Sequence, residues 1–122
     1  MKTPSTELQT LKAEFFRALA HPVRIRLLEV LVVKPTSVQE LQRTLALDQP
    51  IVSQQLARLR AHGIVVARKE GTTTRYSVAD PLLKDLLYVA RRILNRRLTG
   101  VRSMLRELGR DVRAVTRARP SA

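Results

Sequence analysis

A polar helix at about residues 49–62, followed directly by two strands, is the pattern that most restricts what this chain can fold into. Gly63 suits the position just after a helix end. Residues 64–67 and 76–78 are rich in β-branched and aromatic side chains, which are typical of strands. Residues 70–72 include a glycine that can turn the chain between them. We therefore expect a helix with a β-hairpin immediately after it.

Two further helices are predicted at the start of the chain. The first, at residues 8–20, has apolar side chains at three- and four-residue spacing, which places them on one face of a helix. His21-Pro22 ends this helix and starts the next, because proline suits the first helical position and disfavours a helical residue before it. The second helix is expected at residues 22–32. The apolar face of the first helix consists of Leu8, Leu11, Phe15 and Leu19.

A third helix is predicted from Ser37 to about Leu45. Ser37-x-x-Glu40 is a capping box, in which each side chain can bond to a free amide at the helix start. Asp48 is expected to cap the fourth helix, with Pro50 in its first turn. Two helices joined by a short turn form a helix-turn-helix. The predicted fold class is therefore mainly α with a small β-hairpin wing, a winged helix-turn-helix.

The charge balance predicts a polyanionic partner. The chain has 23 basic and 10 acidic residues among 122, a net charge of +13. This sign favours nucleic acid or an anionic membrane surface. The excess is concentrated at the C-terminal end, because residues 91–122 contain ten arginines and only two acidic residues.

The sequence also excludes several classes of function. Cysteine is absent, which excludes disulfides, thiolate metal ligands and thiol redox sensing. The N-terminus has no apolar block of signal-peptide length, and the longest apolar run, residues 30–33, is too short to cross a bilayer. We therefore expect a cytoplasmic protein without a membrane partner. An enzyme is not expected, since the chain has no glycine-rich phosphate loop and no evident histidine–carboxylate pair.

The outward face of the fourth helix has side chains suited to contact bases. Val52, Leu56 and Leu59 share one side, so at about 100° per residue small uncharged residues point the other way. Amides and hydroxyls can pair with base edges in the major groove. A solvated helix face without a ligand has the same composition, and the hairpin that follows favours the DNA interpretation. The predicted base-contacting residues are Gln49, Pro50, Ser53, Gln54 and Gln55.

A second group of residues is expected to contact the DNA backbone. Cations at the tip of the hairpin would lie along the sugar-phosphate chain or enter the minor groove, although a charged hairpin tip can also serve solubility alone. The predicted backbone and wing residues are Arg24, Arg58, Arg60, Arg68, Lys69, Thr73 and Arg75.

Three segments of the chain resemble the ArsR/SmtB family of bacterial repressors. They are Leu19-Ala20-His21-Pro22-Val23-Arg24, Val52-Ser53-Gln54-Gln55-Leu56 and Leu59-Arg60-Ala61-His62-Gly63-Ile64-Val65, and the resemblance covers roughly residues 8–98. It implies a homodimer that binds a palindromic double-stranded DNA operator and blocks transcription until an effector releases it. It also implies that the first and last helices form the dimer interface. The residues that suit this interface are Leu8, Leu11, Phe15, Leu82, Leu86 and Ile93.

The chain departs from the metal-sensing members of that family. Ser37 and Gln39 stand where those members have thiolates, and the last helix has Asp80 and Asp85 but no histidine. A soft-metal site needs cysteines or several converging histidines. We interpret His21 as a helix-junction residue, and we expect neither a metal nor another cofactor. A small apolar effector fits a leucine-lined dimer interface, but no residue requires one.

Residues 1–98 are predicted to form the DNA-binding and dimerisation domain, and residues 99–122 a basic helical extension. The extension has an apolar face that needs a partner. Its arginine face allows three interpretations: a solvated surface, which we favour, further phosphate contacts, or an amphipathic helix on an anionic membrane. Gly100 and Gly109 are expected to kink or end helix segments, and the tail from Arg117 is expected to be disordered.

Two functions remain open from the sequence. The first is a dimeric, sequence-specific transcription regulator, more specifically a repressor. The alternative is an architectural protein that binds nucleic acid with little sequence preference through its wing and its arginine-rich C-terminal helix.

Overall fold

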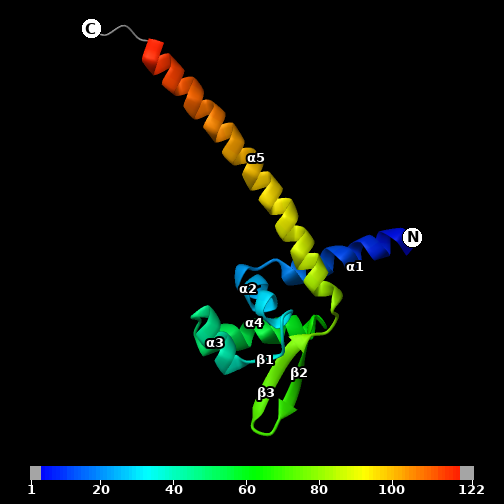
Figure 1. Ribbon diagram of the computed structural model, residues 1–122. Helices are drawn as coiled ribbons and strands as arrows, with labels where there is room; N and C mark the ends of the chain where they lie inside the picture. The colour runs from blue at the N-terminus through cyan, green and yellow to red at the C-terminus, as the bar shows by residue number, and fades with distance from the viewer. Residues whose placement is uncertain (1–3, 119–122) are drawn as a thin grey trace. The chain divides into compact units, whose positions relative to one another are not determined.

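The computed structural model describes residues 4–118, with side chains described from residue 6 to residue 110 (Figure 1). Contacts divide the chain into two units, Met1–Asp85 and Leu86–Ala122, which are described separately. The elements are α1 (Pro4–Leu19), α2 (Pro22–Leu31), β1 (Thr36–Ser37), α3 (Val38–Leu45), α4 (Gln49–Ala61), β2 (Val65–Glu70), β3 (Thr73–Val78) and α5 (Leu82–Ala118). The predicted winged helix-turn-helix is confirmed.

The junction between α1 and α2 forms as the sequence predicts. His21 has an extended backbone (φ −150°, ψ 131°) at the N-cap of α2, and Pro22 is the first helical residue. The backbone amide of Val23 donates to Nδ1 of His21 at 3.1 Å, which satisfies one of the free amides at the helix start. The interpretation of His21 as a junction residue is confirmed.

The capping predictions for the helix-turn-helix are confirmed only in part. Ser37 Oγ accepts from the amide of Glu40 at 3.2 Å, as the capping box requires. The carboxylate of Glu40 does not complete the box, because it accepts from Arg75. Asp48 has the extended backbone of an N-cap residue, but its side chain makes no capping hydrogen bond. The prediction that Asp48 caps α4 through its side chain is therefore wrong.

The two helices of the helix-turn-helix end in the same way. After α3, Ala46 is left-handed (φ 53°) and the amide of Leu47 donates to the carbonyl of Gln42 at 3.1 Å. After α4, Gly63 is left-handed (φ 70°) and the amide of Ile64 donates to the carbonyl of Leu59 at 3.0 Å. A left-handed residue with a bond that spans the last turn is the usual way to satisfy helix-end carbonyls.

A three-stranded antiparallel sheet replaces the predicted hairpin of two strands. Its order is β1-β3-β2, and β2 and β3 are both longer than predicted (Figure 1). β1 was not predicted, since only the capping role of Ser37 was expected there; it pairs with β3 through Thr36 opposite Tyr76 and Ser37 opposite Arg75. Gly71 (φ 61°) turns the chain between β2 and β3, as predicted.

The core of the first unit is aliphatic and lies between helices and sheet. Several helices pack their aliphatic faces against one another and against a small sheet. This layered arrangement is stable for a short domain. This core fixes the position of α4, three of whose residues belong to it. Its most deeply buried residues are Leu27, Leu28, Leu31, Leu41, Val52, Leu56, Leu59 and Val65.

α5 runs without interruption from Leu82 to Ala118. Gly100 and Gly109 lie within α5, so the expectation that they end helix segments is wrong. Arg117 and Ala118 also belong to α5, and residues 119–122 of the tail expected to be disordered lie outside the described residues. The domain boundary expected after residue 98 stays a prediction. No helix in the described part of the chain combines the length and the apolar character needed to cross a bilayer.

Candidate nucleic-acid interface

α4 presents a small polar face opposite its buried side. Val52, Leu56 and Leu59 are fully buried, and the residues that point away from them are exposed or half-buried. Burial of three consecutive turns fixes how the helix is rotated about its axis. The outward residues are Pro50, Ser53, Gln54, Ala57 and Ala61, and Gln49 flanks them, exposed at the start of the helix.

The polar side chains of this face differ in whether they are hydrogen-bonded within the protein. Gln49 Nε2 donates to Ser53 Oγ at 2.8 Å, one turn along the helix, so these two side chains are held together. Gln54 is exposed, and its amide makes no hydrogen bond within the part of the chain that the structure describes. Gln54 therefore has both a donor and an acceptor available for an incoming base.

Gln55 does not fit the predicted base-contacting role. It is only 7% exposed, and its Oε1 accepts from Nε of Arg24 at 2.8 Å. The helical period explains this position, since Gln55 lies roughly 60° from the middle of the apolar face, on the inward side. The same angle calculation applied to the sequence could have placed it there.

Arg24 does not fit the predicted backbone-contacting role. Its guanidinium donates to Gln55 and, through Nη1, to the carbonyl of Ala18 at 2.9 Å. One half-buried arginine of α2 thus connects the last turn of α1 to the inner side of α4. No local pattern predicts this contact, because arginine at a helix start is usually solvated.

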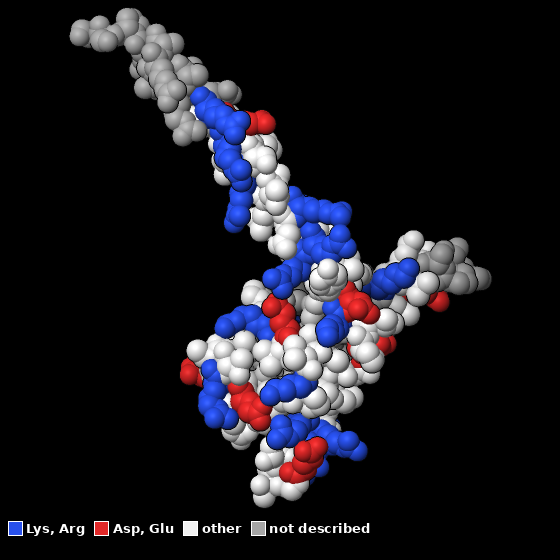
Figure 2. Space-filling model, in the orientation of Figure 1, with Lys and Arg blue, Asp and Glu red and all other residues white. Residues whose placement is uncertain are grey.

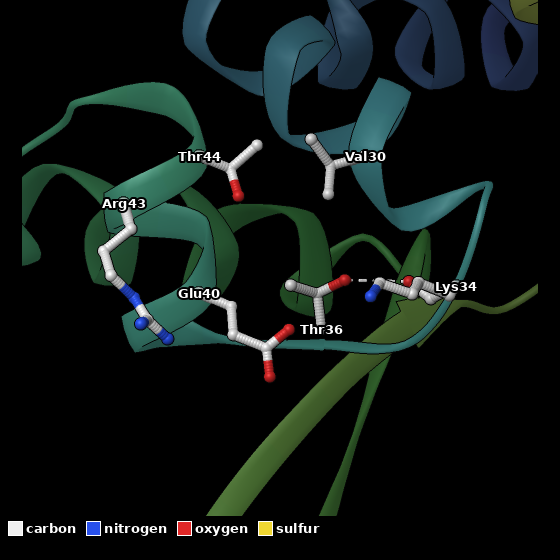
Figure 3. A pocket seen from close by; sticks show the side chains of 6 residues that line it. All are labelled: Val30, Lys34, Thr36, Glu40, Arg43 and Thr44. Carbon is white, nitrogen blue, oxygen red and sulfur yellow. Dashed lines mark hydrogen bonds between the residues drawn. The ribbon is translucent and has the colours of Figure 1, made fainter.

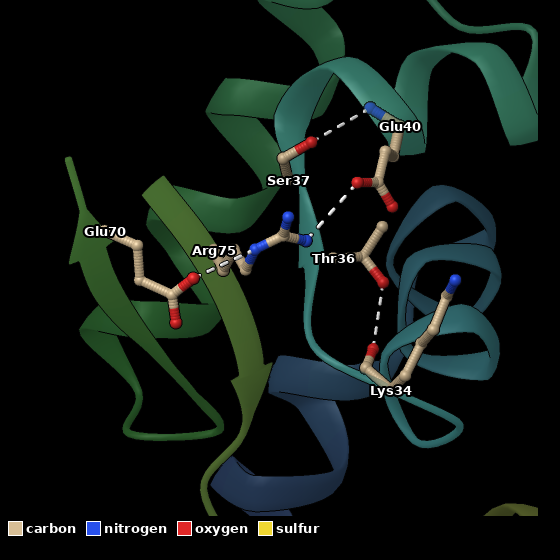
Figure 4. A network of polar contacts seen from close by, with 6 residues as sticks. All are labelled: Lys34, Thr36, Ser37, Glu40, Glu70 and Arg75. Carbon is tan, nitrogen blue, oxygen red and sulfur yellow. Dashed lines mark hydrogen bonds and ion pairs between the residues drawn. The ribbon is translucent and has the colours of Figure 1, made fainter. Parts of the chain in front are cut away.

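Arg75 is held by two carboxylates rather than free on the wing. Its Nη1 lies 3.3 Å from Oε1 of Glu40 and its Nε lies 3.2 Å from Oε2 of Glu70 (Figure 4). These ion pairs connect β3 to both α3 and β2. Arg75 therefore fixes the wing against the helix-turn-helix. The two carboxylates balance its charge in the absence of DNA.

The remaining predicted backbone residues are accessible. Arg58 and Arg60 are exposed in the last turn of α4, and Arg68 and Lys69 are exposed on β2, whereas Thr73 is half-buried at the start of β3. Arg68 and Lys69 are consecutive, so their side chains leave opposite faces of the strand. Figure 2 shows basic side chains interspersed with acidic ones on the visible face of the first unit.

An open hollow of about 420 Å³ lies beside this interface (Figure 3). It is lined by Val30, Lys34, Thr36, Glu40, Arg43 and Thr44. The hydroxyl of Thr36 donates to the carbonyl of Lys34 at 2.9 Å, so it is already bonded within the protein. Glu40 lines the hollow and also pairs with Arg75, which places the wing anchor at its edge.

Comparisons with known proteins agree with this geometry. The profile of the family described as "Bacterial regulatory protein, arsR family" matches residues 21–66. The HTH-type transcriptional regulator Rv0081 of Mycobacterium tuberculosis is 47% identical over 105 residues, 85% of this chain and 92% of that protein. The probable mercury resistance operon repressor of Streptomyces lividans is 40% identical over 90 residues, 74% of this chain and 71% of that protein.

Solved structures give the same fold. The crystal structure of Rv0081 matches 81% of this chain and 97% of its own chain, with a TM-score of 0.71 and 47% identity. The solution structure of a homodimeric winged helix-turn-helix domain from Mycobacterium bovis has a TM-score of 0.72, covering 82% of this chain and 93% of that chain. At 23% identity it supports the fold alone.

Proposed function

The chain belongs to the ArsR family of bacterial regulatory proteins, and we propose that it is a repressor that binds a palindromic DNA operator as a homodimer. Transcriptional regulation is the common activity of its named relatives, several of which are named repressors. The operator symmetry, the dimer and the contacting residues are the parts proposed here.

The observation on which the proposal rests is the outward face of α4. Gln49, Ser53 and Gln54 supply amides and a hydroxyl that can pair with base edges. Pro50 and Ala57 are small, so the helix can enter the major groove without a steric clash. Arg68 and Lys69 on the wing, with Arg58 and Arg60 at the end of α4, would bind phosphates. Gln55, Arg24 and Arg75 are assigned no DNA contact, because Gln55 is buried and the guanidinium groups of Arg24 and Arg75 each bond two other groups of the protein.

The exposed apolar side chains on α1 support the proposed dimer. Leu8 is 52% exposed, Leu11 61% and Phe15 41%, and all three lie on one helix face. Leu82 (67%) and Ile93 (53%) on α5 are similarly exposed, and Leu86 is partly buried. Apolar surface of this extent is common at subunit interfaces. A two-fold dimer would place its recognition helices in successive major grooves, about 34 Å apart.

Competitive gel shifts test the base-contacting role of Gln54. Genomic fragments retained by the purified protein would supply the operator, and a shuffled duplex of equal length would supply the non-specific reference. Gln54→Ala is expected to weaken operator binding by about 10- to 100-fold per half-site and to leave shuffled-duplex binding unchanged, since a paired amide contributes about 1–3 kcal/mol of discrimination.

Gln39→Ala is the matched control, because Gln39 is an exposed glutamine on α3. This variant should keep the full preference for the operator. Equal losses on both duplexes for Gln54→Ala would refute the assignment. Wild-type protein that binds every fragment equally would refute sequence-specific regulation and favour an architectural protein.

A further inference from the structure

The described part of α5 contains an excess of arginine that the proposed DNA site does not use. Residues 91–110 include seven arginines, no lysine and one acidic residue, Glu107. All seven arginines are exposed. Among the residues that the structure describes, none of their guanidinium groups forms an ion pair or a hydrogen bond. These cations are therefore available to a ligand.

The continuity of α5 brings most of these arginines to one side of a single helix. α5 passes through Gly100 and Gly109 without interruption, so angular positions follow from about 100° per residue. The apolar stripe from Leu94 to Leu108 serves as the reference. Six of the seven arginines lie within one arc of about 140°, which begins about 60° from the middle of this stripe, and Arg97 lies on its other side. Figure 2 shows basic side chains along one side of the described part of α5, beside a strip without charge. We call the six residues the α5 arginine face: Arg91, Arg92, Arg96, Arg102, Arg106 and Arg110.

The α5 arginine face differs from an ordinary solvated helix face. Solvated faces usually combine acidic and basic side chains four residues apart, because opposite charges at this spacing stabilise a helix and like charges destabilise it. Here Arg102, Arg106 and Arg110 follow one another at intervals of four residues. Glu107 lies just beyond the edge of the arc and forms no ion pair with any of the described arginines. The face therefore repels itself, and a bound polyanion would supply the missing counter-charge.

The spacing and the chemistry of the face fit a phosphate backbone. A guanidinium group can bind a phosphate through two parallel N–H donors. From Arg91 to Arg110 the face is about 29 Å long at about 1.5 Å per residue, close to the roughly 34 Å of one turn of duplex DNA. Separate arginines can therefore meet separate phosphates. Protein surfaces usually mix charges of both signs, so they match this uniformly basic face less well.

The angular positions favour a duplex over an anionic membrane. A membrane that immersed the apolar stripe would meet Arg91, Arg97 and Arg102 at the borders of the stripe. It would leave the other four arginines, at about 120–160° from the middle of the stripe, pointing away from the headgroups. A duplex lying along the middle of the α5 arginine face would lie within about 70° of all six of its residues.

We propose that the α5 arginine face is a second DNA-contacting surface, which binds the phosphates of a duplex without reading its sequence. It is separate from α4 and the wing. Duplex DNA is the polyanion that the proposed function already brings to this protein, and to that extent the inference rests on that function. Phosphate contacts carry no direct sequence information, so this surface adds affinity for operator and non-operator DNA alike.

The salt dependence of binding to the shuffled duplex tests the proposal. Arg106→Gln removes one charge from the middle of the face with a residue that also favours helices, and Arg97→Gln is the matched control on the other side of the stripe. We expect Arg106→Gln to reduce the slope of log affinity against log salt concentration by about 0.9 per chain, and to weaken binding roughly fivefold at 0.15 M salt. Arg97→Gln should change neither quantity. Equal reductions for the two variants, or no reduction for Arg106→Gln, overturn the proposal.

A second variant excludes a local disturbance at one position. Arg110→Gln lies on the same face and should reproduce the reduction seen for Arg106→Gln. An unchanged slope for Arg110→Gln overturns the proposal.

Two further measurements separate this surface from the α4 site and from a membrane site. The ratio of operator to shuffled-duplex affinity should stay the same for Arg106→Gln and fall for Gln54→Ala, so failure of either proposal is recognised independently of the other. Sedimentation with phosphatidylglycerol vesicles tests the membrane. If Arg106→Gln reduces capture by these vesicles and leaves the duplex slope unchanged, the face binds membrane and the DNA proposal is overturned.

Discussion

Arg24→Ala is expected to destabilise the fold without removing a DNA contact. Arg24 donates from Nε to Gln55 Oε1 at 2.8 Å and from Nη1 to the carbonyl of Ala18 at 2.9 Å. Ala18 is 3% exposed and Gln55 is 7% exposed, so neither acceptor has ready access to water in the native structure. The substitution leaves two buried oxygens without their donors.

The size of the effect follows from these two bonds. A hydrogen bond to a charged group contributes about 1.5–3 kcal/mol, and Arg24 itself is only half-buried, so part of this contribution is screened. We expect the free energy of unfolding to fall by about 2–4 kcal/mol, measured by urea denaturation. Total stabilities of about 5–15 kcal/mol leave the variant folded at low temperature.

Arg26→Ala is the matched control on the same helix. Arg26 Nη2 donates to the carbonyl of Leu45 at 2.7 Å, but the contact is exposed. Water can replace this donor, so we expect a loss below about 1 kcal/mol. Equal losses for the two variants would show that burial of Gln55 and Ala18 does not set the cost.

The salt dependence of DNA binding separates this role from a phosphate contact. Each phosphate contact contributes about 0.9 to the slope of log affinity against log salt concentration. Arg24→Ala should leave this slope unchanged at a temperature where the variant is folded, whereas Arg68→Ala should reduce it by about 0.9 per protomer. A reduced slope together with unchanged stability for Arg24→Ala would refute the structural role and restore the DNA contact.

Three further predictions concern the turn residues and the wing. Ala46→Gly should raise the free energy of unfolding by about 0.5–1 kcal/mol in urea, because it relieves a left-handed alanine; a decrease would show that the turn is unstrained. Gly63→Ala should lower it by about 1–2 kcal/mol and Gly63→Asn by less, since asparagine tolerates φ 70°; identical losses would contradict a backbone cause. Arg75→Met should cost at most about 1 kcal/mol yet speed amide exchange in β3 several-fold, and unchanged exchange would argue against its role as the wing anchor.

The elements that the sequence predicts correctly are those defined by local chemistry. His21-Pro22 and Gly63 set helix ends through interactions within a few residues, so their effect does not depend on the rest of the fold. The alternation of apolar residues in α4 similarly predicts which face is outward. The burial of Gln55 was not predicted because residue type was given more weight than angular position. The contacts of Arg24 were not predicted because its partners lie on other helices, beyond the reach of a local pattern.

The ion pairs of Arg75 were not predicted because the strand β1 was not predicted. A strand of two residues has no period to recognise, and its pairing partner Tyr76 lies forty residues later in the chain. Because Ser37 pairs with Arg75, the first turn of α3 starts beside β3, and Glu40 is brought within 3.3 Å of the guanidinium. The ion pair is therefore a consequence of the strand pairing. Because Arg75 is paired with carboxylates, Arg68 and Lys69 are the cations of the wing that remain exposed and unpaired. We expect these two residues to determine how strongly the wing binds phosphate.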